Sequence, residues 1–418
     1  MNTLTHPGPW LRAVAHAPRP ALHLPWPLRL ALGLFFFVVP LETIGHEAET
    51  SSFTIARLAG LLLVGACLLR PRLFLRAPDT LTRWAFALMT AALLVTAARG
   101  PEHVGYAIGR YATWLQMLVF YHLARPLLAV PSLRRRALQA YVAGAAITAV
   151  LLLRGAGLNT AMADKGRAAL GNQDPNVQAA VLGLAALWLL VQLLHQPLSL
   201  RRPGWLAGWP VFLLLVSASL LTGSRGGLLA LLVGLVAVPF TGGSRTQALR
   251  LLLPAVLGLV ALAAVAAQNE ALVQRLEQSV EQGDTAGRGY LYSSSLDLWV
   301  RRPLLGWGLG ANEAELGAYT NSPLRDMHNI YLYALTAGGL LGGGLLLALL
   351  AHSTRAARHM AVGPDRQAAL VSLVFVLTFG ATVTIFFFKF FWVALLLATP
   401  VHAPAALTRR PLAAEARL

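Results

Sequence analysis

Three side chains at the ends of apolar segments have types and positions that suit an anion site with a general base beside it. Arg225 in TGSRGG and Arg288 in GRGY each stand in the first turn of an expected helix. A cation there opposes the helix dipole unless an anion lies between it and the free N–H groups of that turn. His328 precedes Asn329 at the start of another apolar segment, where the dipole disfavours a charged imidazole. A neutral imidazole can accept a proton, so we interpret His328 as a general base and the two arginines as an anion clamp.

Five further polar residues near the ends of these segments are candidates for binding a phosphate group or a sugar. They are Asp326, Asn329, Asn176, Arg57 and Arg110. Asp326 is also close enough in sequence to orient His328. For Arg57 and Arg110 the alternative is a contact with lipid headgroups, because a basic side chain at the end of a membrane span can extend to the interface.

Motifs for metal or nucleotide chemistry are missing from the sequence, which contains no HExxH, Walker loop, GxSxG or DxD pair. The segment LETIGHEAET carries Glu42, His46, Glu47 and Glu49, which form either a metal site or a solvated loop. We expect the solvated loop, no metal and no cofactor. A single cysteine, Cys67, excludes an intrachain disulfide.

The composition places these candidate residues in a membrane protein. Of 418 residues, 56% are hydrophobic and 12% charged, and the mean hydropathy is +0.61. A helix needs roughly 20 mainly apolar residues to cross a bilayer, and such stretches recur along the chain. The sequence therefore predicts an all-α polytopic membrane protein with about 12 spans. They are expected at 28–45, 53–69, 82–98, 104–124, 136–154, 176–195, 205–222, 225–240, 249–267, 328–352, 367–385 and 386–402. The phenylalanine-rich junction of the last two is either a tight turn or the middle of one longer element.

The charged residues divide unequally between the two sides of this topology. The termini and alternate loops hold 21 Arg and 3 acidic residues, whereas the rest of the chain holds 13 basic and 14 acidic residues. The positive-inside rule makes the Arg-rich side cytoplasmic, with both termini on it. Since topology accounts for the whole net charge of +17, nucleic-acid binding has no support.

One long polar segment interrupts the spans and is predicted to be periplasmic. The expected organisation is spans one to nine in residues 1–267, a loop in 268–327, and the last three spans with a tail in 328–418. Within the loop, residues 287–303 have apolar side chains at helical spacing and end at a proline, which predicts an amphipathic helix. The GWGLG that follows, 306–310, permits a tight turn or a close backbone approach.

Four motifs in order resemble the O-antigen ligase and polymerase family. They are GNQDPN, TGSRGG, GRGYLYSSSLDLWVRRPLLGWGLG and MHNIYLYAL, and the resemblance extends over about residues 165–352. Within that family the chain most resembles the O-antigen ligases of Gram-negative bacteria. The resemblance implies a GT-C-like, metal-independent inner-membrane enzyme that moves a polysaccharide from undecaprenyl pyrophosphate to lipid A-core. It assigns the functional positions to Arg225, Arg288 and His328. An acidic residue that some members have near the last spans is replaced here by Lys389.

Other functions remain open from sequence alone. An O-antigen polymerase would share the donor and use a second lipid-linked glycan as acceptor. A protein O-oligosaccharyltransferase is a further alternative, although the periplasmic portion is short. A lipid or glycan transporter is the non-enzyme alternative, and the sequence shows neither the broken helices nor the paired halves typical of transporters.

Overall fold

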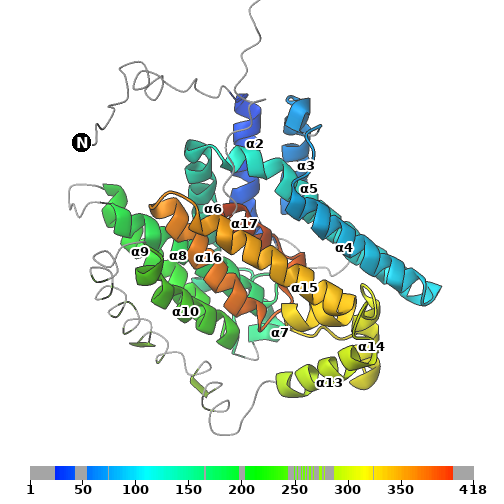
Figure 1. Cartoon of the computed structure of the whole chain (residues 1–418). Helices are drawn as coiled ribbons and strands as arrows, with labels where there is room; N and C mark the ends of the chain where they lie inside the picture. Colours follow the sequence, from blue (N-terminus) through cyan, green and yellow to red (C-terminus); the bar gives the residue numbers. More distant parts are fainter. Residues whose placement is uncertain are drawn as a thin grey trace, which may run out of the picture.

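The computed structural model describes residues 24–42, 54–73, 75–163, 166–196, 203–242, 287–322 and 324–398, with isolated positions between 249 and 277. Within these residues every regular element is a helix, and extended backbone pairs only in an isolated bridge between Leu158 and Leu170. Figure 1 shows the helices gathered into one bundle, with α13 and α14 side by side at one end. The predicted all-α class is confirmed for the described part of the chain.

Eleven of the twelve predicted spans contain a helix, and in the remaining one, 249–267, only isolated positions are described. In chain order the helices are α2 (Trp26–Val38), α3 (Ile55–Leu68), α4 (Thr80–Ala97), α5 (Val104–Leu128), α6 (Pro131–Leu153), α7 (Thr160–Ala163), α8 (Pro175–His195), α9 (Pro203–Leu221), α10 (Arg225–Thr241), α13 (Arg288–Arg301), α14 (Ala311–Tyr319), α15 (Ile330–Arg358), α16 (Pro364–Gly380) and α17 (Lys389–Ala398). Short 3₁₀ turns cover Val39–Leu41, Pro71–Leu73, Pro101–His103 and Ile385–Phe387. The predicted amphipathic helix of the long loop is α13.

Length and apolar composition make this a multi-pass membrane protein. Four described helices, α4, α6, α8 and α15, are long and apolar enough to cross a bilayer, and five shorter helices are also apolar. Large apolar side chains lie on the outer surface of the bundle, among them Leu61 at 59% exposure and Leu94 at 64%. Such a surface is stable in lipid and would associate in water.

Helix α8 is the centre of the bundle. It packs against α6, α9, α10 and α16, and nearly all of its side chains are buried. Trp188 of α8 donates its indole N–H to Ser372 of α16 at 2.5 Å, so the one polar group of this large buried side chain is satisfied.

The last two predicted spans are separate elements. Helix α16 ends at Gly380, and α17 begins at Lys389, so the phenylalanine-rich junction is a turn. The described part of α17 has ten residues and is about 15 Å long. Its side chains from Phe390 to Ala398 are all buried, and it packs against α5, α15 and α16. Helix α17 therefore lies inside the bundle.

Helix α15 is broken at Gly339, whose φ of 62° lies in the left-handed region. In an unbroken helix the N–H of Leu340 would bond to the carbonyl of Thr336. Here Leu340 donates to Pro303 at 2.7 Å, and the Thr336 carbonyl accepts from Trp307 at 2.8 Å. The loop before α14 thus pairs the backbone groups at the break. The expectation from sequence that no helix is broken was wrong at this point.

The predicted close approach at GWGLG is confirmed by the same contact. Gly306 has a φ of 70°, and a Cβ on it would meet the backbone of Thr336 and Ala337. Gly308 donates to the Ala337 carbonyl at 3.0 Å. No residue other than glycine fits Gly306 without strain.

The starts of α8, α10, α13 and α15 and the end of α16 meet at one end of the bundle. Tyr292 of α13 donates to the carbonyl of Ala381 at 2.7 Å, and Ser224 before α10 donates to Asn176 of α8 at 2.8 Å. The charge distribution predicts that this end is periplasmic.

Cysteine labelling tests that orientation. In a Cys67→Ala background, Tyr290→Cys on α13 and Val362→Cys at the opposite end place a thiol where the native side chains are 59% and 61% exposed. We expect a membrane-impermeant maleimide to label Tyr290→Cys in intact spheroplasts and Val362→Cys only after permeabilisation. The reverse pattern would invert the topology.

Candidate active site

Arg225 is held at the junction of three elements. The Ser224 hydroxyl caps α10 by accepting the N–H of Gly227 at 3.0 Å, and Arg225 is the first helical residue, as predicted. A Cβ on Gly226 would overlap Thr382, and one on Gly227 would overlap Ala179 of α8. The start of α10 therefore packs closely against both neighbours, which fixes the half-buried Arg225 beside them.

Arg288 is the first residue of α13 and is close enough to Arg225 for the two charges to interact. Gly287, with a φ of 72°, precedes it, and the Arg288 side chain is half-buried. Burial lowers the pKa of the Arg288 guanidinium, the nearby Arg225 lowers it further, and Tyr292 and Asp174 oppose the shift. Two like charges in one partly desolvated region favour the binding of an anion between them.

His328 has an unusual backbone conformation that two hydrogen bonds maintain. Its φ is 50°, which is uncommon for a residue other than glycine. Its N–H donates to Asp326 Oδ1 at 2.5 Å, and its carbonyl accepts from the Tyr292 hydroxyl at 3.3 Å. Burial raises the pKa of Tyr292, so this hydroxyl remains a donor. Strained backbone of this kind is frequent at functional sites.

Asp326 is adjacent to the His328 ring, but its hydrogen bond goes to the backbone. The ring Nδ1 lies 4.0 Å from Asp326 Oδ1, beyond hydrogen-bond length. The same carboxylate oxygen accepts the Thr384 hydroxyl at 2.7 Å. The imidazole is 37% exposed, so it is accessible to a substrate. In this structure Asp326 therefore bonds to the backbone of the loop and to Thr384, and its predicted role in orienting the imidazole stays a prediction.

Asn329 and Asn176, the two predicted asparagines, both form structural hydrogen bonds at this end. Asn329 is the N-cap of α15, accepts from Tyr331 and Leu332, and donates to Ala381 at 3.2 Å. Asn176 accepts from Ser224 and, at 3.0 Å, from Arg167. Each asparagine joins the start of its own helix to a second element.

Arg110 and Arg57, the other two candidates, lie on a different part of the bundle. Arg110 forms an ion pair with Glu313 of α14 at 2.6 Å and lies over the ring of Phe387 at 4.7 Å. Arg57, in the first turn of α3, lines a groove that also contacts Lys389. The described contacts of Arg110 are thus with α14 and the segment before α17, and those of Arg57 with the groove beside α3.

Glu313 is the acidic partner that the sequence analysis missed. Its side chain is 2% exposed and also accepts hydrogen bonds from the hydroxyls of Tyr106 and Tyr333, at 3.2 and 3.3 Å. Burial raises the pKa of the Glu313 carboxyl, and Arg110 opposes this. A buried carboxylate needs such partners, so the Arg110 pair holds α14 to α5.

The acidic segment after α2 is only partly described. Glu42 forms an ion pair with Lys389. Lys389 stands at the position near the last spans where some members of the resembled family have an acidic residue. His46, Glu47 and Glu49 lie outside the described residues. Among the residues that are described, no group of three His, Cys, Asp or Glu side chains could hold a metal ion.

Arg225, Arg288 and His328 lie at the starts of α10, α13 and α15, at the end of the bundle where α8 also begins. Free N–H groups and positive dipole ends of helices attract anions. Bidentate arginines can hold a phosphate, and the exposed imidazole can accept a proton beside it. The geometry suits a displacement at a carbon that carries a phosphate leaving group.

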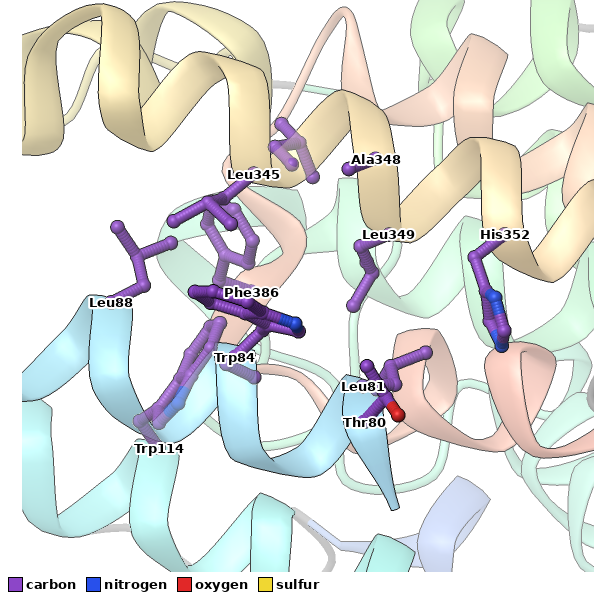
Figure 2. A pocket seen from close by; sticks show the side chains of 12 residues that line it. Thr80, Leu81, Trp84, Leu88, Trp114, Leu345, Ala348, Leu349, His352 and Phe386 are labelled. Atoms are coloured by element: carbon purple, nitrogen blue, oxygen red, sulfur yellow. The ribbon is translucent and has the colours of Figure 1, made fainter.

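An apolar groove of about 310 Å³ runs between α4 and α15. Figure 2 shows Trp84, Trp114 and Phe386 grouped at one part of the groove, with His352 further along α15. Phe386 follows Thr384 by two residues, so the groove reaches the segment that bonds to Asp326. Its lining suits a hydrocarbon chain.

Comparison with known families matches part of the chain. The family model described as O-antigen ligase matches residues 210–347, so the chain carries an O-antigen ligase domain, and Arg225, Arg288 and His328 lie within it. The match covers about a third of the chain and is to a family of O-antigen ligase-type enzymes. No curated protein matches the chain.

Truncation of Glu313 tests whether the Arg110 pair is structural. Glu313→Ala leaves a guanidinium without its partner, which costs about 3–5 kcal/mol for a buried pair. We expect a clear fall in the thermal midpoint of the purified protein, and a smaller fall for Glu313→Gln, whose amide oxygen can still accept hydrogen bonds. Asp297→Ala, at an exposed position on α13, is the control. If Arg110→Ala weakened donor binding without changing the midpoint, Arg110 would be a ligand residue.

Proposed function

We propose that the protein transfers a completed O-antigen polysaccharide from undecaprenyl pyrophosphate to lipid A-core, at the periplasmic face of the bacterial inner membrane. The reaction would proceed with inversion and without a metal ion, on a GT-C-like membrane domain with both termini cytoplasmic. The observation that carries this proposal is the grouping of Arg225, Arg288 and His328 at the helix starts of an O-antigen ligase domain.

The leaving group explains why two arginines suffice as electrostatic catalysts. Bidentate contacts from Arg225 and Arg288 would stabilise the charge that develops on the pyrophosphate as the bond between the anomeric carbon and the phosphate oxygen breaks. The half-buried positions of both side chains strengthen these contacts relative to water.

His328 would supply the base. The acceptor hydroxyl attacks the anomeric carbon on the face opposite the leaving oxygen, its proton passes to the imidazole, and the lipid pyrophosphate departs. Asp326, which accepts the His328 N–H, and the Tyr292 hydroxyl, which donates to the His328 carbonyl, would keep the backbone of the histidine in place.

Reconstitution of the purified protein identifies the acceptor. Lipid-linked glycan with lipid A-core should give ligated product. Growth of the glycan on a second copy of the donor would indicate a polymerase, and transfer to a protein hydroxyl would indicate an oligosaccharyltransferase. Movement of the donor across the bilayer without transfer would indicate a transporter.

Conservative substitution tests the arginine clamp. Lysine keeps the charge but cannot form the two parallel bonds of a guanidinium. Since a hydrogen bond to a charged group contributes about 1.5–3 kcal/mol, Arg225→Lys and Arg288→Lys should each lower the ligation rate by roughly tenfold or more. Arg301→Lys, at the other end of α13, should retain activity. A wild-type rate in either site variant would exclude the bidentate contact at that position.

Removal of the imidazole tests the base. His328→Ala should lower the rate by about 10²- to 10⁴-fold, because a general base typically contributes that much, while binding of undecaprenyl pyrophosphate to the arginines persists. His359→Ala, at the exposed end of α15, is the matched control.

A chelator tests whether the reaction needs a metal ion. EDTA should not change the wild-type ligation rate. Substantial ligation by His328→Ala would remove the histidine from the chemistry. Inhibition by EDTA would direct attention to Glu42, Glu47 and Glu49.

A further inference from the structure

A second apolar groove, of about 580 Å³, lies between α3 and α5. It occupies a different face of α5 from the groove in Figure 2, because Trp114 lines that groove whereas Leu115 and Val119 line this one. Residues of α5 from Ala112 to Leu123 border it, a length of about 16 Å along the helix axis. That is roughly half the thickness of the hydrocarbon core, or one leaflet.

Two basic side chains border this apolar groove. Arg57, in the first turn of α3, and Lys389, the first residue of α17, both contribute to its lining. Lys389 pairs with Glu42, so these three charged groups carry a net charge of +1. An ammonium group has three N–H donors, and one carboxylate oxygen occupies only one of them. A cation beside hydrocarbon is costly, so an anion that accepted from the further N–H donors of Lys389 would be favourable here.

The basic side chains lie at the same end of the bundle as His328. Lys389 is five residues beyond Thr384, whose hydroxyl bonds to Asp326. The segment between α16 and α17 contacts two parts of the bundle. Its residue Thr382 packs against Gly226, which directly follows Arg225 at the start of α10, and Lys389, where the segment ends, lines the groove with Arg57.

We propose that the groove between α3 and α5 binds the lipid anchor of the acceptor, with a headgroup phosphate against Arg57 and Lys389 and an acyl chain along α5. A transfer between two membrane lipids needs a separate position for each. If the donor pyrophosphate binds to Arg225 and Arg288, the groove between α3 and α5 supplies a separate position for the acceptor lipid. The identity of the acceptor rests on the proposed function, whereas binding of a phosphorylated, acylated lipid can be measured without it.

Site-specific photocrosslinking tests this assignment in the full-length protein in nanodiscs. A benzophenone amino acid replaces Gln116, which is exposed in the groove, or Ile108, a control on α5 outside it with 53% exposure. With purified lipid A-core as probe, we expect adducts at position 116 at least about fivefold above those at position 108. We expect Arg57→Gln combined with Lys389→Gln to remove most of this excess.

A groove-filling variant controls for loss of the Lys389 ion pair. Ala112→Trp places an indole in the groove from an exposed position and leaves both cations intact, and Ala91→Trp on α4 is its matched control. Ala112→Trp should raise the KM for lipid A-core by roughly tenfold and leave the KM for the donor unchanged. Ala91→Trp should change neither constant.

Equal adduct yields at positions 116 and 108, or a rise in the donor KM alone, would overturn the proposal. Preferential crosslinking of undecaprenyl pyrophosphate at position 116 would assign the groove to the donor instead. If lipid A-core crosslinks at position 116 but receives no glycan in the transfer assay, the proposed function fails and the lipid site stands.

Discussion

The pairing of the loop at 303–308 with the break in α15 is the constraint on which the His328 end of the bundle depends. In a hydrocarbon environment every backbone N–H and C=O must be paired within the protein. The break at Gly339 exposes such groups, and residues 303–308 pair them. Because the loop also bonds to α4 through Leu309 and Thr96, it fixes the first half of α15. That half begins directly after His328 and Asn329.

The chemistry follows from where helices start. A bundle that places several helix starts at one end concentrates positive dipole ends there, and the two arginines add full charges. The buried ion pair of Arg110 and Glu313 has a different role, since it joins α5 to the loop helix α14. Arg110 is the seventh residue of α5 and has an acidic partner in the fold, whereas Arg225 and Arg288 are the first residues of their helices.

Local signals in the sequence predicted the all-helical fold and the helix starts at which the candidate site residues lie. The motifs TGSRGG, GRGY and MHN are short-range features expected at the starts of helices, and α10, α13 and α15 begin at them. The positions of Arg225 and Arg288 in the first turns of their helices were predicted from the same short-range features. The membrane composition set the class, because no water-soluble fold could bury so much apolar surface.

Contacts between distant segments could not be predicted in this way. The sequence around Arg110 does not indicate its partner, Glu313, which lies 203 residues later. Thr384 and Asp326, whose side chains form a hydrogen bond, are 58 residues apart in the sequence. The stretch TAGGLLGGG offers several glycines, and nothing local selects Gly339 as the break. The selection comes from the loop at 303–308, which is itself positioned by tertiary packing.

A structure with bound undecaprenyl pyrophosphate, determined by electron cryomicroscopy without acceptor, would test the central claim most directly. The account predicts density for the pyrophosphate between Arg225 and Arg288, at the start of α10 and within reach of His328. Pyrophosphate density against Arg57 and Lys389, with the Arg225 and Arg288 side chains unengaged, would contradict it.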